Sequence, residues 1–110
     1  PLIKIDASHE HFYNYEAKYF SDETKYICPS GLDPRVEERI QKRCFNACKL
    51  FAIKGWGRID FFIDQNDEPV ILEINTVPGM TTHSLVPMAA SEVGIDFDQL
   101  CFDILEMSAV

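Results

Sequence analysis

Residues 56–75 read WGRIDFFIDQNDEPVILEIN, two apolar-rich runs separated by a short polar loop. In the first run, residues 56–64, apolar side chains recur at every second position, as in a β-strand with one buried face. The second run, residues 70–75, alternates in the same way, and the loop between them carries Asn, Asp and Pro, which favour turns. The stretch therefore predicts an antiparallel β-hairpin, in which we expect Ile63 to lie opposite Val70.

This register brings polar side chains together on one face of the hairpin. It places Asp60 opposite Glu73, and Arg58 then lies opposite Asn75 on the same face. Two carboxylates that face each other across a strand pair repel, so they need either solvent or a bound cation. Asp, Glu and Asn offer only hard oxygen ligands, which suit Mg²⁺ or Mn²⁺. Because Mg²⁺ is commonly held by a few carboxylates together with substrate phosphates, the face also implies a nucleotide.

An acidic strand face has a plainer interpretation as solvated surface. Two features favour chemistry instead. Arg58 on the same face has a fork of donors that can hold a carboxylate or a developing oxyanion. The second strand also leads directly into residues 76–84, where Gly79 permits close backbone approach and Ser84 can open a helix whose first N–H groups bind an anion.

Helices are predicted on both sides of the hairpin. Asp33 and Pro34 form an N-cap and a first helical residue, and Gly55 is a suitable C-cap, so we expect a helix over residues 34–53. Its apolar positions recur at the spacing of one helical face: Val36, Ile40, Cys44, Cys48, Phe51 and Ala52.

The ends of the chain carry further elements. Residues 2–6 and 12–20 are predicted to be extended, and residues 21–25 form a polar stretch that we expect to be mobile. Ser84 can cap a helix that ends near Gly94, and Asp96 with Gln99 is the capping box of a last helix. We therefore predict one α/β (α+β) domain with an antiparallel or mixed sheet packed against helices.

Composition excludes several classes of function. The 110 residues include 18 acidic and 10 basic side chains, for a net charge of −8, which argues against binding to nucleic acid or to an anionic membrane. No apolar run is long enough to span a bilayer and no signal peptide opens the chain, so we expect a soluble, cytoplasmic protein. The four cysteines form no CxxC pair and are interpreted as reduced core thiols.

The residues around the predicted site resemble a known family. Residues 55–61, 72–81 and 83–87 closely resemble the signature of the D-alanine-D-alanine ligase family of ATP-grasp enzymes, and residues 15–19 and 21–24 resemble its mobile loop. The similarity runs along nearly the whole chain. It implies that residues 1–110 are the C-terminal part of an ATP-grasp domain, lacking the N-terminal domain and the central ATP clamp. The start at Pro1, directly on strand-like sequence, also suggests a piece of a longer protein.

The resemblance implies a role for each matching residue near the metal. Asp60, Glu73 and Asn75 would hold two Mg²⁺ or Mn²⁺ ions that bridge the phosphates of ATP, with Glu73 spanning both ions. Arg58 and the backbone N–H of Gly79 would stabilise the tetrahedral oxyanion.

Further roles concern the substrates. Ser84 and the backbone of Leu85 would bind the carboxylate of the second D-alanine. Lys18 would contact the transferring phosphate, and Tyr19 would close over the site as in members that form the dipeptide. By the same resemblance, the adenine pocket would be walled by Phe12 and Leu72, although an aromatic residue and a leucine on strands are more often plain core.

The implied activity is the ATP-dependent joining of two D-alanines through an acyl phosphate, for the synthesis of peptidoglycan precursors. We expect the piece alone to be inactive. The expected partners are ATP and D-alanine, and a homodimer is one assembly considered for the whole enzyme. Two alternatives stay open. The chain could belong to another ATP-grasp carboxylate-amine ligase, or it could be a non-catalytic domain whose acidic face is solvated.

Overall fold

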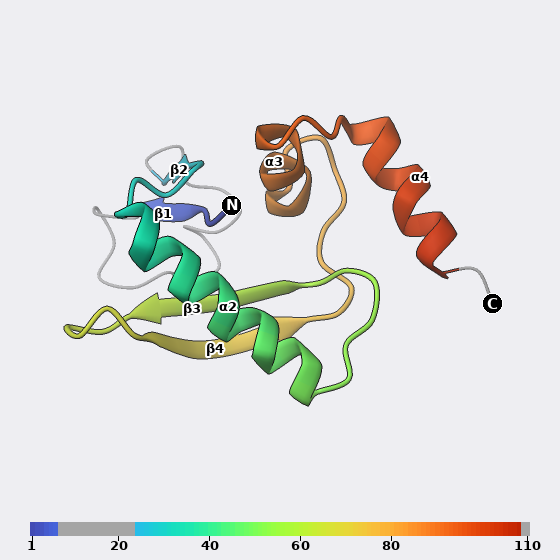
Figure 1. Cartoon of the computed structure of the whole chain (residues 1–110). Coiled ribbons are helices and arrows are strands. Elements are labelled where there is room, and N and C mark those ends of the chain that lie inside the picture. Colours follow the sequence, from blue (N-terminus) through green and yellow to red (C-terminus); the bar gives the residue numbers. More distant parts are fainter. Residues whose placement is uncertain (7–23, 109–110) are drawn as a thin grey trace.

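The computed structural model describes residues 1–6 and 24–108. Within these ranges the chain forms the elements β1 (Lys4–Asp6), β2 (Lys25–Ile27), α2 (Pro34–Leu50), β3 (Arg58–Ile63), β4 (Pro69–Asn75), α3 (Leu85–Glu92) and α4 (Phe97–Ser108) (Figure 1). The predicted mixture of helices with antiparallel strands is confirmed. The described strands form two separate ladders of two strands each, β1 with β2 and β3 with β4. No described helix combines the length and the apolar character needed to cross a membrane.

The β3–β4 hairpin has the predicted register at the end that carries the polar face. Asp60 pairs with Glu73, and Arg58 pairs with Asn75. Nearer the loop the prediction is wrong, because the register shifts after Asp60 and Ile63 pairs with Pro69 in place of Val70. The hairpin therefore contains a β-bulge, an irregularity that a strict alternation of side chains cannot reveal.

The loop of the hairpin explains this shift. The Asp64 carboxylate Oδ1 accepts hydrogen bonds from Asn66 N at 2.8 Å and from Glu68 N at 3.0 Å, and Asp64 N donates to Glu68 O at 2.9 Å. These bonds fix a tight loop, and the loop fixes the pairing of the residues beside it. Leu72 is left without a partner position, since Asp60 pairs with Glu73 and the next residue pairs with Ile71.

Helix α2 begins as predicted and ends earlier. The Asp33 side chain accepts a hydrogen bond from Arg35 N at 2.9 Å, and Pro34 is the first helical residue. The helix ends at Leu50, and Ala52 adopts the left-handed conformation with φ 55° just after it, while Gly55, the predicted C-cap, lies further on with φ 80°. Its predicted end at residue 53 is therefore wrong.

The end of α2 is closed by a Schellman motif. Ala52 N donates to Lys49 O at 3.0 Å, and Ile53 N donates to Cys48 O at 3.0 Å. These two bonds satisfy carbonyl groups of the last turn. Alanine rarely adopts a positive φ, so nothing in the sequence indicated that Ala52 would close the helix. The prediction therefore extended the helix toward Gly55.

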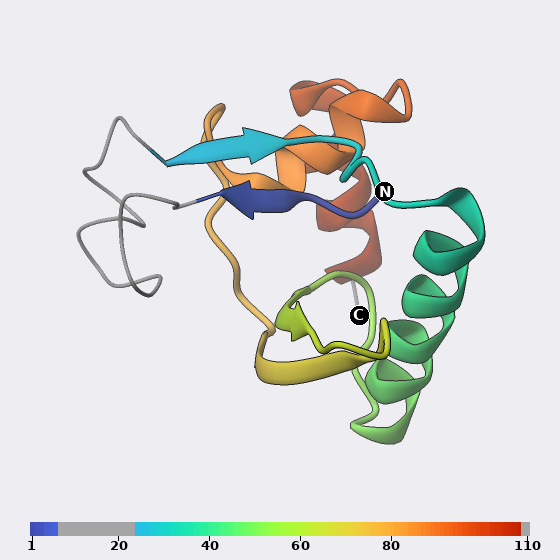
Figure 2. The ribbon, with the colours of Figure 1, turned by 90° about the vertical axis from the view of Figure 1, so that its left-hand side faces the viewer.

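Helix α2 lies along the hairpin and is held to it by buried and charged contacts (Figures 1 and 2). Ile40 is fully buried and Cys44 is nearly so, as the helical pattern predicted. Phe51 is 67% exposed, so the predicted apolar face is not covered at its C-terminal end. On the outer side, Arg39 Nη2 donates to the Asp67 carbonyl at 2.8 Å in the hairpin loop. Nearby, the ion pair between Arg43 Nε and Glu68 Oε2 is 3.1 Å long.

The β1–β2 ladder was only half predicted. Strand β1 lies inside the extended segment expected over residues 2–6, but β2 includes Lys25, which was assigned to a mobile polar stretch. Pairing of Ile5 with Tyr26 supplies a partner that local sequence does not show. The segment expected over residues 12–20 lies outside the described residues.

Helices α3 and α4 contact each other at the other end of the chain. Ser84 occupies the N-cap of α3, and the helix closes at Gly94, which has φ 87°. At the start of α4, Asp96 Oδ1 accepts a hydrogen bond from Gln99 N at 2.8 Å, as a capping box requires. Only half of the predicted box forms, because the Gln99 side chain donates to Asp103 Oδ1 at 2.7 Å.

All four cysteines are free thiols. Burial raises the pKa of the Cys44 thiol, and the neighbouring Cys48 raises it further. Burial also raises the pKa of Cys28, with a smaller contribution from the negative charge of Glu92. These two thiols are therefore protonated at neutral pH. Because the thiolate is the reactive form, both cysteines are poor nucleophiles.

Candidate active site

The polar face of the hairpin is built around one ion pair. Arg58 Nε donates to Asp60 Oδ1 at 2.8 Å, and Arg58 Nη2 donates to Asp60 Oδ2 at 3.0 Å. The two side chains are only 18% and 23% exposed. A guanidinium fork on both oxygens of a carboxylate is a geometrically specific and charge-assisted contact, and it positions both groups beside β4.

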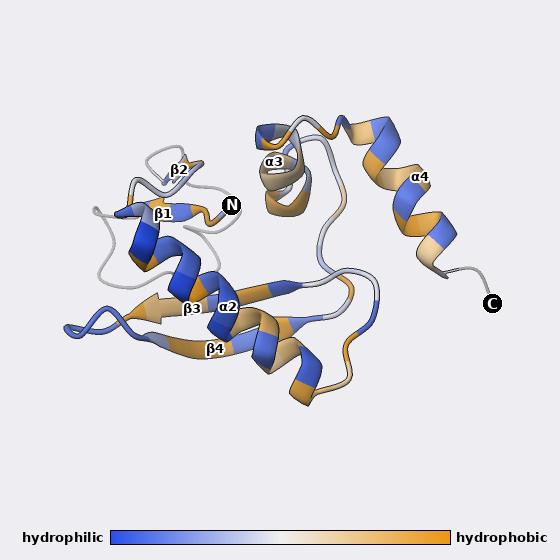
Figure 3. Ribbon diagram, in the orientation of Figure 1, coloured by the Kyte–Doolittle hydropathy of each residue, from blue (hydrophilic) through white to orange (hydrophobic). Residues whose placement is uncertain are grey.

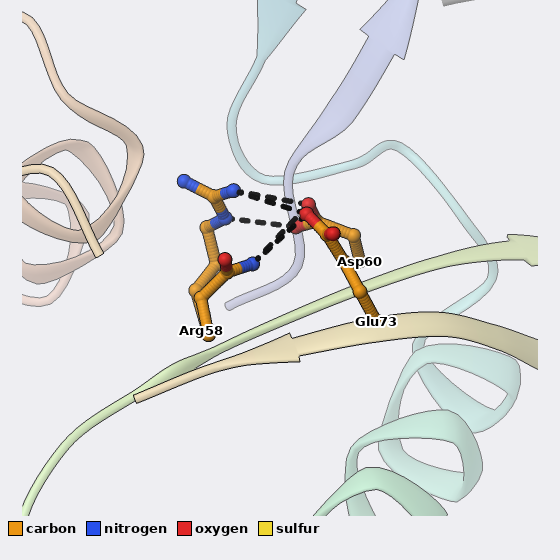
Figure 4. Close-up of polar contacts among 4 residues, drawn as sticks. Arg58, Asp60 and Glu73 are labelled. Atoms are coloured by element: carbon orange, nitrogen blue, oxygen red, sulfur yellow. Dashed lines mark hydrogen bonds and ion pairs between the residues drawn. The ribbon is translucent and has the colours of Figure 1, made fainter. Parts of the chain in front are cut away.

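Glu73 and Asn75 complete this face from β4. Asn75 Nδ2 donates to Glu73 Oε1 at 3.2 Å and lies 3.5 Å from Asp60 Oδ2. Arg58 Nη2 also lies 4.0 Å from Glu73 Oε1, although Glu73 is 54% exposed. Figure 4 shows Arg58, Asp60 and Glu73 rising from one side of the hairpin with their polar ends together. We define the carboxylate cluster as Arg58, Asp60, Glu73 and Asn75.

Gly57 allows the two strands to approach beside the cluster. A Cβ atom at this position would lie 3.1 Å from the Asn75 carbonyl oxygen, closer than nearly all real contacts of this kind. No role was predicted for Gly57. Its signal was the glycine directly before Arg58, which is a common sign of close backbone approach in a strand.

A second group of predicted residues lies in the turn that leads from β4 to α3. The Ser84 hydroxyl makes no capping hydrogen bond within α3; its Oγ accepts from Thr81 N at 2.9 Å and lies 2.8 Å from Thr81 Oγ1. A Cβ atom on Gly79 would lie 3.2 Å from Ser84 Oγ. The structure therefore brings Gly79 and Ser84 together, with Thr81 as a partner that sequence analysis missed.

The remaining predicted residues are not all placed. Leu85 is the first residue of α3 and is half-buried. Leu72 is 65% exposed at the bulge, so its alternative interpretation as plain core is wrong. Phe12, Lys18 and Tyr19 lie outside the described residues.

The donor set of the carboxylate cluster fits a hard divalent cation. Asp60, Glu73 and the side-chain oxygen of Asn75 offer oxygen ligands, and no group of three or more His, Cys, Asp or Glu side chains that could cage a metal occurs in the ranges 1–6 and 24–108. An ion held here would need further oxygen ligands from a substrate or water. That is the usual way in which proteins hold Mg²⁺ beside phosphates.

The fold and the cluster together define a domain of the ATP-grasp class. The chain belongs to the family described as D-ala D-ala ligase C-terminus, whose family model matches residues 1–106.

The relatives found by sequence are ligases. The chain is 51% identical over 108 residues to the D-alanine--D-alanine ligase of Nitrosomonas europaea. This match covers 98% of this chain and 35% of that protein. It is 49% identical over 110 residues to the D-alanine--D-alanine ligase of Laribacter hongkongensis, covering 100% of this chain and 35% of the relative. The chain thus spans about a third of the length of these relatives.

Solved structures show the same fold. The D-alanine--D-alanine ligase of Bacillus anthracis complexed with ATP matches with a TM-score of 0.77 and 28% identity, over 98% of this chain and 33% of that one. The VanG D-Ala:D-Ser ligase of Enterococcus faecalis matches with a TM-score of 0.75 and 29% identity, over 97% of this chain and 30% of that one.

Proposed function

We propose that this chain is the metal- and phosphate-handling part of a D-alanine-D-alanine ligase, an enzyme that joins two D-alanines at the expense of ATP for peptidoglycan precursors. The observation that carries the proposal is the carboxylate cluster, in a chain about half identical to ligases of this name. The pairing of Asp60 with Glu73 beside a basic fork is what such chemistry needs. An acidic face that is only solvated does not require this arrangement of two carboxylates and an arginine.

The cluster supplies the electrostatic part of the proposed reaction. Asp60, Glu73 and the Asn75 side-chain oxygen would hold the two Mg²⁺ or Mn²⁺ ions. When bound, the ions neutralise the negative charge of the ATP phosphates. Arg58 adds a fork of hydrogen-bond donors that stabilises the oxyanion formed when an amine adds to the acyl phosphate.

The turn after β4 supplies the positional part. The Gly79 N–H donates to the same oxyanion as Arg58, and the Ser84 hydroxyl with the Leu85 N–H holds the carboxylate of the second D-alanine at the start of α3. The contact between Gly79 and Ser84 supports this, since both groups then act on one substrate molecule. Because a helix N-terminus favours negative charge, a carboxylate is well placed there.

Four further residues complete the proposal. Lys18 contacts the transferring phosphate and Tyr19 closes over the substrates. The adenine lies against Phe12 and against Leu72, whose 65% exposure at the bulge leaves it available for such a contact.

The proposed reaction has two steps. The carboxylate of the first D-alanine attacks the terminal phosphorus of ATP, which forms an acyl phosphate and releases ADP. The amine of the second D-alanine then attacks the acyl carbon, and phosphate leaves with formation of the amide. The protein forms no covalent bond in either step, so its contribution is position and charge.

The proposal covers the context of the chain as well. Residues 1–110 correspond to about the last third of a cytoplasmic ligase, which binds ATP and D-alanine and can form a homodimer. The 98% coverage of this chain against 35% of a relative supports a larger enzyme. We expect no catalysis from the chain alone.

A specific observation supports a second candidate for the same fold. The likeness to a D-Ala:D-Ser ligase is as close as the likeness to the Bacillus anthracis protein, so D-serine is the alternative second substrate. The two candidates differ only in the nucleophile.

Product identification tests the proposal in the whole protein that contains this chain. With ATP, Mg²⁺ and equal amounts of D-alanine and D-serine, we expect ADP, phosphate and D-alanyl-D-alanine in equal amounts. Asp60→Asn should abolish the product, while Asp67→Asn, the same change on the hairpin loop, should not. A product that contains D-serine would favour the second candidate, and ADP release that needs no amino acid would refute both.

A further inference from the structure

We propose that Arg58 and the divalent ion compete for the Asp60 carboxylate, so that metal binding releases the Arg58 guanidinium to act on substrate. This inference rests on the proposed metal site and adds a coupling between its two kinds of positive charge. The bidentate contact between Arg58 and Asp60 carries it.

The Arg58 fork engages both oxygens of Asp60. Its Nε and Nη2 atoms lie 2.8 Å from Oδ1 and 3.0 Å from Oδ2. The spacing of a guanidinium matches a carboxylate, so one side chain engages both oxygens of the group. With the two side chains 18% and 23% exposed, water screens this contact less than an ion pair on the open surface.

Hydrogen-bond donors also fill the space between the two carboxylates. Arg58 Nη2 lies 4.0 Å from Glu73 Oε1, and Asn75 Nδ2 lies 3.2 Å from the same oxygen. A Mg²⁺ ion that both carboxylates bind needs their oxygens at about 2.0–2.1 Å, and N–H groups cannot remain between them. Asn75 can turn its amide and present an oxygen, whereas Arg58 has no acceptor atom and has to leave.

The released guanidinium remains close to the proposed chemistry. Arg58 is the first residue of β3 and pairs with Asn75, the last residue of β4, where the turn with Gly79 begins. An ion that displaces Arg58 from Asp60 therefore frees a cationic fork beside the place where an anion would form. By thermodynamic reciprocity, an anion that holds Arg58 also tightens binding of the metal.

The test is Mn²⁺ binding, measured from the electron paramagnetic resonance signal of free Mn²⁺ without nucleotide. We expect Arg58→Met to bind Mn²⁺ about tenfold more tightly than the unaltered chain, because charge-assisted hydrogen bonds no longer compete. Arg43→Met removes the same charge from the 3.1 Å ion pair on α2 and serves as the matched control, with no change expected. Circular dichroism melts show whether each variant keeps its fold.

A third variant separates displacement from simple charge repulsion. Arg58→Lys keeps the positive charge but loses the bidentate fork, so its Mn²⁺ affinity should move toward that of Arg58→Met. Equal affinity of Arg58→Lys and the unaltered chain would overturn the proposal, as would an Arg58→Met variant that binds Mn²⁺ no better.

A direct signal accompanies the titration. The Arg58 Nε–H resonance should be protected from exchange by its 2.8 Å hydrogen bond, and it should lose this protection as Mg²⁺ is added. Retained protection with the ion bound would contradict displacement. If Asp60→Asn leaves Mn²⁺ binding unchanged, the metal site itself is wrong, an outcome distinct from failure of the coupling.

Discussion

Single residues of the carboxylate cluster could be predicted from the sequence because they depend only on alternation along two strands. Asp60 and Glu73 share a face in the structure as the simple two-residue period requires. Gly57 and Thr81 could not be found in the same way. Gly57 matters because of the Asn75 carbonyl on the other strand of the hairpin, whereas Thr81 matters because of the Ser84 hydroxyl three residues further on in the same turn. Neither contact follows from the alternation of side chains along a strand.

The left-handed residue at the end of α2 gives a prediction about stability. Ala52 has φ 55°, in the region that favours glycine. Ala52→Gly should raise the free energy of unfolding by about 0.5–1 kcal/mol, because relief of the steric penalty exceeds the added entropy of the unfolded chain. Urea denaturation measures the change. Ala47→Gly, the same substitution inside α2, is the control and should lower stability by about 1 kcal/mol; a loss at both positions would contradict the assigned Schellman motif.

At the scale of elements, the hairpin shows why half of its register could be predicted. The polar end follows the two-residue period, but the loop end follows the hydrogen bonds of Asp64, and the two registers differ by one residue. The bulge at Leu72 reconciles them. Similarly, the start of α2 at Asp33 could be predicted from its cap, whereas its end depends on a conformation that Ala52 rarely adopts.

The Glu37 carboxylate joins α2 to the segments that flank the first ladder, and this contact gives a second prediction. Glu37 Oε1 accepts hydrogen bonds from Leu2 N and from Ser30 Oγ, both at 3.1 Å. Glu37→Ala should lower the free energy of unfolding by about 1–3 kcal/mol, since it removes a charged acceptor from two partly buried donors. Thermal and urea denaturation measure it.

The neighbouring residue provides the control. Glu38 is 68% exposed and forms only an ion pair with Lys42 at 3.4 Å, so Glu38→Ala should cost no more than about 0.5 kcal/mol. Equal losses from the two variants would show that helix charge, and not the contacts of Glu37, governs stability.

Across the whole molecule, little apolar surface is buried among the described residues. Ile40 is the one large side chain there that is fully buried, while several large apolar side chains are more than half exposed. These exposed residues are Phe45, Leu50, Phe51, Phe62, Leu72, Val77, Val93, Phe102, Leu105 and Met107. Figure 3 shows that hydrophobic and hydrophilic residues alternate along α4. Periodicity predicts which residues share a face, but it cannot tell whether that face is covered. For this reason Phe51 was assigned to the core and is not there.

This distribution yields a third prediction. Ile40→Ala should lower the free energy of unfolding by about 2–5 kcal/mol, because it opens a cavity at a fully buried position. Leu105→Gln on α4, where the leucine is 69% exposed, should cost less than about 0.5 kcal/mol. Denaturation at several protein concentrations measures both. A large loss for Leu105→Gln that grows with concentration would show that copies of the chain cover α4 in solution.

The measurement that tests the central claim most directly is calorimetric titration of ATP into the chain with and without Mg²⁺. The proposed site predicts that ATP binding requires Mg²⁺ and weakens at least tenfold, about 1.4 kcal/mol, in both Asp60→Asn and Glu73→Gln. Asp67→Asn makes the same charge change at a loop residue with φ 57°, a conformation that asparagine tolerates, and should bind like the unaltered chain. Equal ATP binding by all four folded proteins, or binding indifferent to Mg²⁺, would contradict a metal and phosphate site on this hairpin.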